Sequence, residues 1–422
     1  MRSPSFGSAS SGATTLTPGA SPFFWWNQRE VGNYSALLSG RTWIGSDGDS
    51  VRTKPTFITY SFQSRMTEAD ADAFPGSRSH WHSFSRKDKA DARAALKKWG
   101  AASGITFLEA KGDHGDIQFS WAPQEDSSGL GYFPASDDLG DITYDNFYVE
   151  SYDEIAGNIY LNTHDRSRFA ADPAWKKYVL LHEIGHALGL KHPFSSTFYN
   201  GRMLSEKYDS VSNTVMAYLK EGEKPPTSLK KFDIQAIRKL YGSHKMDGKQ
   251  VAQWSWNAKT EVLTQIGKTT DDVLWGTKVT DKLYGDYGND RLHGMAGDDL
   301  LSGGPGSDIL IGGPGRDSFR FDHDPAADRS IDTILDFNAD FDRIDLWTGA
   351  FRDLGPAGVL LSTKFAEGSA AKDLLVRILF DTDTDQIIYD SDGSGPAPSI
   401  VVAQLKLKAA ETMVNAGHFW VV

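Results

Sequence analysis

A nine-residue repeat in the second half of the chain limits its fold more than any other sequence feature. Six aspartates follow one another at intervals of nine residues, namely Asp272, Asp281, Asp290, Asp299, Asp308 and Asp317. Two positions after each comes an apolar residue, and five before each lies a glycine: Leu274, Leu283, Leu292, Leu301, Leu310 and Phe319, and Gly267, Gly276, Gly285, Gly294, Gly303 and Gly312. This period predicts short strands that stack into a solenoid with the apolar side chains inside. A disordered Asp/Gly-rich linker would not keep its apolar residues in phase.

The negative charge of the chain belongs to the same half. Of the 422 residues, 267–422 hold 26 acidic and 14 basic residues, which accounts for the whole formal charge of −12. Of those acids, 24 are Asp. The length predicts two domains. The absence of cysteine excludes disulfides, zinc–thiolate sites and thiol catalysis. No apolar run is long enough to span a membrane as a helix.

The first half is typical of a mixed domain without regular βαβ alternation. Alternating apolar residues predict strands at 57–62, 105–110, 116–122 and 157–162. Helical spacing predicts helices at 87–102, over Asp172–Gly189 and at 228–241. We expect the first helix to bury Ala90, Ala94, Leu96 and Trp99. The small polar residues 1–20 indicate a flexible leader or pro-segment without the apolar stretch of a signal peptide. The aromatic side chains of the segment Pro22–Trp26 are expected to pack on the domain that follows. After Phe319, strand-like segments suggest a terminal β-sandwich or jelly-roll-like cap.

The segment HEIGHALGLKH, residues 182–192, predicts a metal site. His182 and His186 are one helical turn apart, so both imidazoles leave the same face and can bind one zinc ion. Gly189 can turn the chain so that His192 supplies a third nitrogen. Glu183 can reach a zinc-bound water without ligating the metal and act as its general base. The alternative is a helix with incidental histidines. The other eight histidines show no ligand spacing.

This pattern resembles the zinc motif of the metzincins. The proline that follows it, Pro193, makes it similar to the motif of the serralysin branch. The resemblance extends to the landmarks ITYSF, GDIQFS, GLGYFP, GNIYLN and FDIQAIRKLYG. It implies that Met216 in TVMAY forms the floor of the metal site. It also implies that Tyr218 ligates zinc and then assists the oxyanion, although Ala217 stands where the family usually has Ser. The segment Gly129–Pro134 would be the sheet edge at which an extended substrate pairs as an added strand.

The acidic repeats resemble the GGxGxDxUx repeats of RTX proteins, which form a parallel β-roll that binds calcium. The resemblance implies calcium ligation by turn residues with hard oxygen atoms, at Gly285, Gly288, Asp290, Gly294, Gly297, Asp299, Gly303, Gly304, Gly306, Asp308, Gly312, Gly313, Gly315 and Asp317. Asp286 and Met295 replace the second glycine of two repeats. The repeats at Asp272 and Asp281 have Thr270 and Val279 at the fourth position, which leaves ligation there open.

These resemblances imply an α+β chain. A metzincin-like catalytic domain at 21–245, with a twisted mixed sheet and helices, precedes an all-β domain of parallel β-roll and β-sandwich at 246–422. We therefore expect a serralysin-like metalloendopeptidase with one catalytic zinc and several structural calcium ions. We expect it to act on proteins as an extracellular bacterial monomer. Export would use type I secretion machinery and an uncleaved tail ending in HFWVV, in which His418 departs from the usual acid.

Two other functions are alternatives for a chain with such repeats. One is a calcium-dependent surface-binding or adhesive RTX protein with a vestigial protease domain, although every catalytic position is filled. The other is an RTX lipase, which requires a GxSxG turn that the sequence lacks. Nucleic-acid binding is disfavoured by the net charge, and Lys230, Lys231, Arg238 and Lys239 are interpreted as a solvated helix face. The sequence leaves cleavage preference and the number of calcium ions open.

Overall fold

A computed structural model describes residues 5–7, 28–43, 56–125, 127–134, 155–197, 200–246, 251–407 and 413–422. The expected aromatic segment 22–26 lies outside these residues, as does most of the expected leader. The chain divides into two compact units, residues 1–249 and 250–422, whereas the sequence suggested a boundary after residue 245. None of the described helices combines the length and apolar character needed to cross a membrane.

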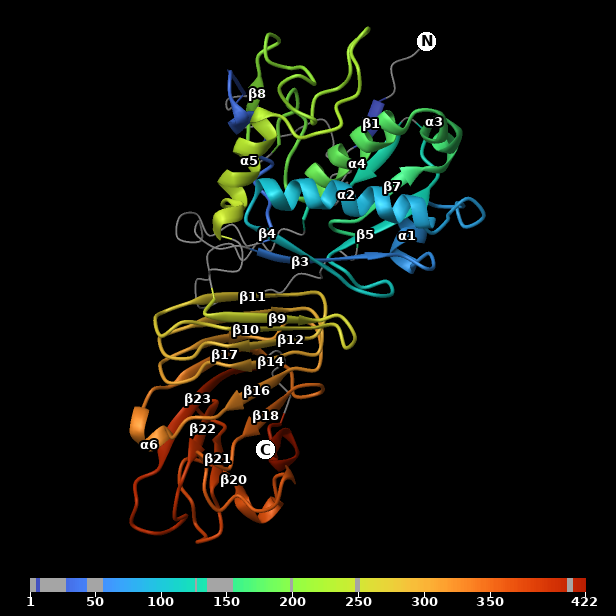
Figure 1. The fold of residues 1–422 in the computed structure, drawn as a ribbon. Helices are drawn as coiled ribbons and strands as arrows, with labels where there is room; N and C mark the ends of the chain where they lie inside the picture. The colour runs from blue at the N-terminus through green and yellow to red at the C-terminus, as the bar shows by residue number, and fades with distance from the viewer. Residues whose placement is uncertain are drawn as a thin grey trace, which may run out of the picture. The chain divides into compact units, whose positions relative to one another are not determined.

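The first unit contains a six-stranded mixed sheet with helices, as the α+β assignment predicted (Figure 1). In this sheet β6 and β7 are antiparallel neighbours, and the other neighbouring strands pair in parallel. In spatial order the strands are β1 (Ser5–Gly7), β6 (Ser127–Gly131), β7 (Ile159–Asn162), β5 (Ile117–Ala122), β3 (Thr56–Phe62) and β4 (Ile105–Glu109). A second, two-stranded sheet pairs β2 (Arg29–Val31) with β8 (Arg202–Leu204).

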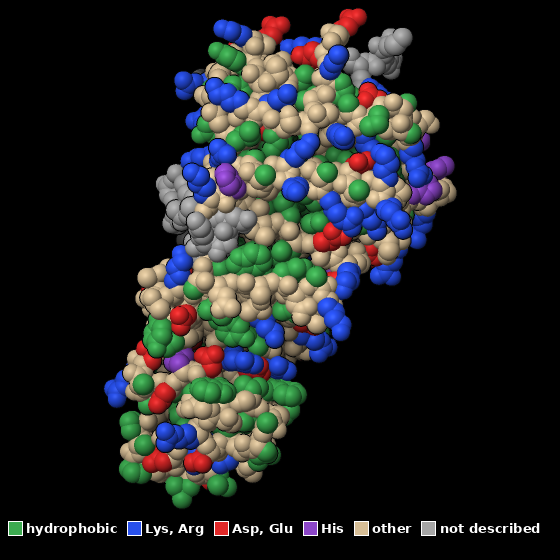
Figure 2. Space-filling model, viewed as in Figure 1, with side chains coloured by type: hydrophobic (Ala, Val, Ile, Leu, Met, Phe, Trp, Pro, Cys, Tyr) green, Lys and Arg blue, Asp and Glu red, His purple; other side chains and the backbone are tan. Residues whose placement is uncertain are grey.

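Within the described ranges of this unit, five α-helices accompany the sheet: α1 (Glu68–Ala73), α2 (Arg86–Ala102), α3 (Arg166–Ala171), α4 (Pro173–Ala187) and α5 (Lys231–Tyr241). The long helices α2 and α4 pack on each other, and the indole Nε1 of Trp99 donates to the Leu181 carbonyl across their contact at 3.2 Å. Lys and Arg side chains cover the exposed face of α2 (Figure 2). The opposite face of α2 is buried, so α2 forms a layer between α4 and solvent.

Helix α4 is almost entirely buried, which places the zinc motif inside the unit. Asp172 caps its start by accepting hydrogen bonds from the backbone amides of Ala174 and Trp175, both at 3.0 Å, and Pro173 occupies the first turn. The helix ends at Ala187, and Gly189 follows with φ +90°. Helix start, helix end and turn therefore lie where the sequence predicted them.

The second unit consists of two eight-stranded sheets between which successive repeats alternate. One sheet has the order β19 (Gly358–Val359), β24 (Phe419–Val421), β18 (Arg343–Leu346), β16 (Ser318–Phe321), β14 (Leu300–Ser302), β12 (Asp281–Tyr284), β10 (Val262–Ile266) and β9 (Gln253–Asn257). The other has β11 (Val273–Thr277), β13 (Arg291–Met295), β15 (Ile309–Ile311), β17 (Asp332–Phe337), β23 (Ile400–Leu407), β22 (Gln386–Tyr389), β21 (Ile378–Asp381) and β20 (Phe365–Glu367).

The register of these sheets repeats every 18 residues, or two nonapeptides. Leu283 pairs with Leu301 in one sheet, and Leu292 pairs with Leu310 in the other. All six apolar residues predicted to face inward are buried in one core. This β-rich arrangement is consistent with an RTX β-roll. The strands after Phe321 extend the same two sheets, because β18 and β24 continue the first and β17 and β23 continue the second.

Candidate metal centres

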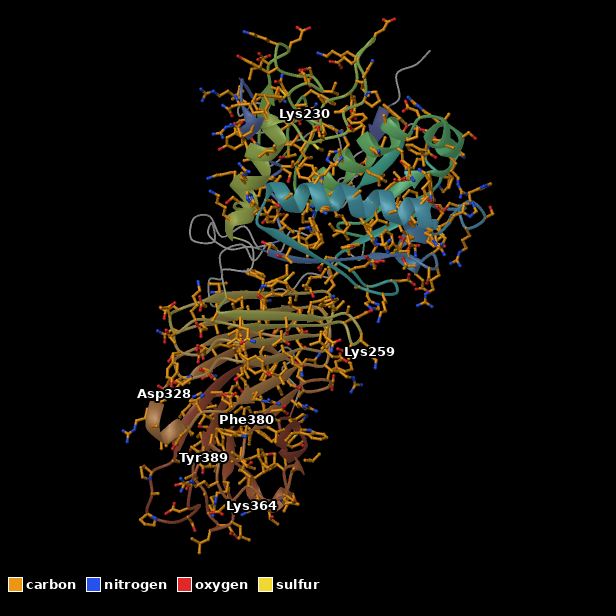
Figure 3. All side chains as sticks on the ribbon, in the orientation of Figure 1. Lys230, Lys259, Asp328, Lys364, Phe380 and Tyr389 are labelled. Atoms are coloured by element: carbon orange, nitrogen blue, oxygen red, sulfur yellow. The ribbon has the colours of Figure 1, made fainter. Side chains whose placement is uncertain are left out.

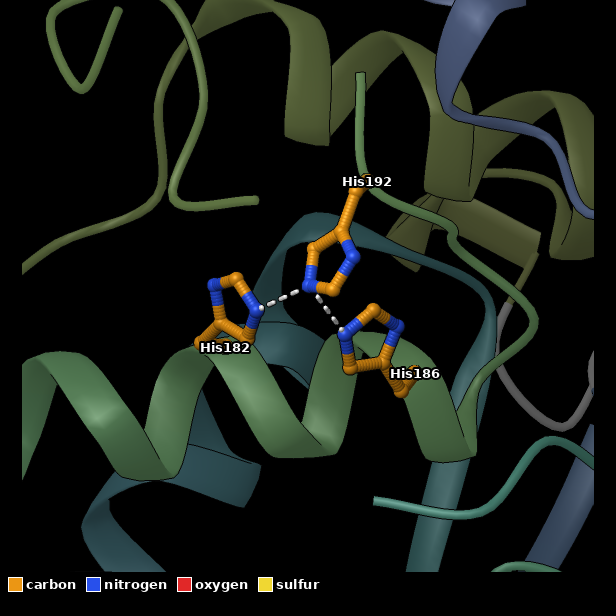
Figure 4. Close-up of side chains that lie close together, drawn as sticks. All are labelled: His182, His186 and His192. Atoms are coloured by element: carbon orange, nitrogen blue, oxygen red, sulfur yellow. Dashed lines mark hydrogen bonds between the residues drawn. The ribbon is translucent and has the colours of Figure 1, made fainter. Parts of the chain in front are cut away.

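The three predicted histidines converge on one point (Figure 4). His182 and His186 point from α4 toward His192, whose Nε2 lies 3.0 Å from His182 Nε2 and 3.1 Å from His186 Nε2. All three side chains are buried, and no other group of three or more His, Asp or Glu residues in the described part of the chain comes together in this way. The remaining histidines are not part of this cluster.

The surroundings of the histidines prepare them to bind a cation. Nδ1 of His182 lies 2.8 Å from the Val215 carbonyl oxygen, and Nδ1 of His186 lies 2.7 Å from that of Leu190. A carbonyl can only accept, so both rings carry their proton on Nδ1 and turn an Nε2 lone pair to the centre. Burial lowers the pKa of His186 to about 4 and that of His182 well below its usual value. Neutral, converging nitrogens of this kind fit zinc.

Glu183 lies beside the first histidine and is fully buried. Neither of its carboxylate oxygens makes a well-formed hydrogen bond to a described residue. Burial raises the pKa of Glu183 well above its usual value, and the backbone N–H of Gly131 opposes this shift by less. Strand β6 approaches α4 so closely that a Cβ at residue 131 would collide with the Glu183 backbone. Glycine at that position therefore permits the strand to lie along the helix beside Glu183.

Met216 packs against α4, the helix that carries His182 and His186. Its side chain is buried and so close to Gly185 that a Cβ on residue 185 would collide with the sulfur. The turn that carries Met216 is fixed by Asp233, which accepts hydrogen bonds from the Thr214 hydroxyl at 2.5 Å and the Val215 amide at 3.0 Å. The same carboxylate caps α5 by accepting from the backbone amide of Lys230, labelled in Figure 3. Sequence reasoning missed Gly185 and Asp233, because their partners are distant along the chain.

The ring of Tyr218 belongs to the same cluster. Its centroid lies 4.9 Å from that of His192 and 6.1 Å from that of His182. Tyr218 is only half-buried, in contrast to the histidines. The structure therefore places all five residues of the predicted zinc site, including Glu183, in one part of the first unit.

In the second unit, the repeat aspartates form two ladders that run along the roll. From Asp290 on, Oδ1 of each repeat Asp accepts a hydrogen bond from the backbone amide of the Asp one coil earlier. The pairs in one ladder are Asp290–Asp272 at 2.7 Å and Asp308–Asp290 at 2.7 Å, and in the other Asp299–Asp281 at 2.7 Å and Asp317–Asp299 at 3.0 Å. The second oxygen, Oδ2, of Asp290, Asp299, Asp308 and Asp317 is buried without a hydrogen-bond partner.

These four orphaned oxygens fit calcium. Each lies next to the first glycine of its own repeat, at Gly285, Gly294, Gly303 and Gly312. An unpaired buried carboxylate oxygen is costly, and an oxygen-ligated cation removes that cost. The glycines Gly288, Gly297, Gly306, Gly304 and Gly313 adopt the left-handed backbone of the turns, and Gly315 approaches the Gly297 carbonyl closely. Asp286 and Met295 adopt the same positive φ at the two positions where glycine is replaced.

Both ladders continue one coil beyond the predicted repeats. Asp332 Oδ1 accepts from the Asp308 amide at 3.0 Å, and Asp342 Oδ1 accepts from the Asp317 amide at 2.9 Å. Asp336 accepts from the backbone amides of Gly312 and Gly313 at 2.9 and 2.7 Å. The sequence spacing is 24 and 25 residues here instead of 18. The inserted residues include helix α6 (Pro325–Asp328), whose last residue is labelled in Figure 3.

Two family models match the parts of the chain that carry the histidine cluster and the aspartate ladders. The matrixin peptidase family model matches residues 77–242. The model of the RTX calcium-binding nonapeptide repeat (4 copies) matches residues 266–299 and 284–319. The chain therefore combines a matrixin domain with RTX repeats. A matrixin domain implies a catalytic zinc ion, and RTX repeats imply structural calcium.

Among individual proteins, the chain is homologous to serralysins. Serralysin A from Dickeya chrysanthemi is 26% identical over 236 residues, which is 52% of this chain and 45% of that protein. Serralysin from Photorhabdus sp. (strain Az29) is 26% identical over 243 residues, 53% of this chain and 46% of that protein. The chain spans about half the length of the relatives it matches. A solved structure, the AlgE6R3 subunit from the Azotobacter vinelandii mannuronan C5-epimerase, is 28% identical over 36% of this chain and 80% of that chain, with a TM-score of 0.25.

Proposed function

We propose that this protein is a secreted zinc-dependent endopeptidase that hydrolyses internal peptide bonds of proteins. The observation that carries this proposal is the convergence of His182, His186 and His192 beside the buried carboxylate of Glu183. Three neutral imidazoles leave one coordination position open, which is typical of catalytic zinc sites. The matrixin domain and the serralysin homologues support the same class of reaction.

Each residue has a distinct role in this proposal. His182, His186 and His192 hold zinc, which when bound supplies a Lewis acid that polarises the peptide carbonyl and makes a water ligand more acidic. Glu183 takes a proton from the attacking water on a carboxylate oxygen and delivers it to the leaving nitrogen. Tyr218, whose ring lies beside His192, donates its hydroxyl to the developing oxyanion. Met216 packs against Gly185 and so supports α4 between the first two histidines.

Substrate would bind along β6, because this strand runs beside Glu183 and an extended peptide can add to its outer edge. That edge is paired by the three-residue strand β1, with Ser5 opposite Ser127 and Gly7 opposite Leu130. A substrate would therefore compete with residues 5–7 for the backbone groups of β6. The pairing of β1 with this edge supports a role for the leader as an inhibitor of substrate binding.

The second unit would make the enzyme dependent on calcium. Asp290, Asp299, Asp308 and Asp317 would share calcium ions with the turn residues of neighbouring coils, and Asp332 and Asp342 extend the same ladders. Folding of the roll would then await the high calcium concentration outside the producing cell. We infer export through type I secretion machinery and action as a monomer on protein substrates. An adhesive role with a vestigial protease domain is disfavoured, since no catalytic position is lost.

The test is the isosteric variant Glu183→Gln, assayed on casein at fixed zinc and calcium. The loss of the proton acceptor should reduce kcat by about 10²- to 10⁴-fold while the zinc content is retained. Glu206→Gln is a matched control, because Glu206 is an exposed acid outside the cluster. Unchanged cleavage by Glu183→Gln, or cleavage that resists removal of zinc, would contradict the proposal.

A further inference from the structure

The third histidine of the cluster is held differently from the other two. His182 and His186 belong to α4, and a backbone carbonyl fixes the Nδ1 atom of each. His192 lies beyond the helix in an irregular segment, and within the described part of the chain its Nδ1 has no hydrogen-bond partner. The orientation of its ring must therefore come from another contact.

That contact is the ring of Phe194, two residues further along the chain. The two rings are stacked, with centroids 5.1 Å apart and an interplanar angle of 9°. This is the separation of an attractive offset stack. Phe194 is 41% exposed, so burial of its own side chain in a core does not explain its position.

Tyr218 contacts both rings of this stack. Its ring meets His192 edge-on at 4.9 Å and 68°, and meets Phe194 at 4.8 Å and 63°. Each of the three rings therefore contacts the other two. The face of the His192 imidazole is held by Phe194, and Tyr218 restrains both rings from one side.

We propose that Phe194 is a positioning residue of the zinc site, which holds the imidazole plane of His192 so that its Nε2 faces those of His182 and His186. The inference rests on the proposed role of the three histidines as zinc ligands. Stacking replaces, for His192, the carbonyl contacts that orient the other two rings. Without it, the His192 side chain regains rotational freedom that zinc binding must then remove. The same change would also remove the ring contact between Tyr218 and Phe194.

The experiment compares zinc affinity of the full-length, calcium-loaded protein by competition with a chromophoric chelator. Phe194→Ala should bind zinc about 10- to 100-fold more weakly, the usual effect of losing a group that orients a ligand. Phe194→Tyr keeps the ring and should bind like wild type. Phe194→Leu keeps apolar bulk without a ring plane and should resemble Phe194→Ala. Phe341→Ala is the matched control, since Phe341 is 52% exposed and belongs to the second unit.

The outcomes separate this inference from the proposed function. Equal zinc affinity of wild type and Phe194→Ala, with far-UV circular dichroism showing both folded, would overturn it. Wild-type affinity in Phe194→Leu would also overturn it, because the ring would then be dispensable. If wild type binds zinc and cleaves no protein, the proposed function fails while the order of zinc affinities still supports the role of Phe194. Steady-state kinetics should show a lower kcat in Phe194→Ala at subsaturating zinc, which added zinc restores.

Discussion

Lys176 is a buried cation at the contact between the two long helices of the first unit. Its side chain is 4% exposed, and its ammonium pairs with Asp88 and, at 2.9 Å, with Asp91, both on α2. Asp88 also accepts from the indole Nε1 of Trp121 at 3.2 Å. Burial raises the pKa of Asp88, but the hydrogen bonds from Lys176 and Ser85 outweigh it and lower the pKa overall. The network therefore ties α4, which carries the zinc motif, to α2.

Removal of this one cation should destabilise the first unit strongly. Lys176→Met leaves the Asp88 carboxylate buried without its charge partner, and the free energy of unfolding should fall by about 3–5 kcal/mol. The neighbouring Lys177 is exposed, and Lys177→Met should change the free energy of unfolding by no more than about 0.5 kcal/mol. Urea denaturation of the calcium-loaded protein, followed by tryptophan fluorescence, measures both. Equal midpoints for the two variants would show that the pair contributes little.

The same network explains which side-chain assignments were predictable. The histidines follow from local helical spacing, which tertiary contacts did not disturb. In α2, Leu96 and Trp99 are buried as predicted, but Ala90 and Ala94 are exposed, and Ala92 and Ala95 take their place. Ala92, Ala95, Leu96 and Trp99 have the i, i+3, i+4, i+7 spacing of one helix face, to which Ala90 and Ala94 do not belong. Asp88 lies on that face and pairs with Lys176, although hydrophobic periodicity treats it as a surface residue. A distant partner of this kind leaves no local signal.

At the scale of elements, strand β1 determines how accessible β6 is. The parallel pairing of residues 5–7 with β6 occupies the backbone groups that a substrate strand would need. Deletion of residues 2–10 should therefore lower KM for protein substrates several-fold with little change in kcat. Steady-state kinetics on casein measure this directly. Deletion of residues 11–18 should have a smaller effect, because β1 itself is retained. An unchanged KM after deletion of residues 2–10 would contradict competition at this edge.

In the roll, the nine-residue period of the sequence ends before the regular pairing of the strands does. Six repeats, which make three coils, are visible because glycine, apolar residue and Asp recur in phase. The next coil places Ile334 and Ile344 in the same core and Asp332 and Asp342 in the same ladders. Insertions, including α6, break the nine-residue period without breaking the strand register. Periodicity detects a constant spacing, whereas packing requires only that each strand reach its neighbour.

At the scale of the whole molecule, part of the negative charge forms an ordered array of carboxylates along the roll. In the four central ladder residues, one carboxylate oxygen accepts from the backbone and the other is left for a cation: Asp290, Asp299, Asp308 and Asp317. The array replaces the stabilisation that disulfides would provide in a chain without cysteine. Its stability must therefore depend on calcium and protons together, since both neutralise the same carboxylates.

Calcium-free protein should consequently be more stable in mild acid than at slightly alkaline pH. Burial raises the pKa of Asp290 and Asp308 to about 7 and that of Asp317 to about 8, whereas an unfolded Asp titrates near 3.9. Between about pH 4 and 8 the folded roll then binds more protons than the unfolded chain, so its stability falls as the pH rises.

Thermal unfolding in EDTA, followed by circular dichroism, should show a lower Tm at pH 8 than at pH 5.5. Excess calcium should reverse the trend, because calcium binds the deprotonated carboxylates. Asp299→Asn removes one ladder charge whose pKa burial raises well above its usual value, and should reduce the pH dependence in EDTA and raise the calcium midpoint. Asp383 is exposed in the turn between β21 and β22, outside both ladders, so Asp383→Asn should change neither quantity appreciably. A calcium-free roll that is more stable at pH 8 than at pH 5.5 would show that its carboxylates are already neutralised by other contacts.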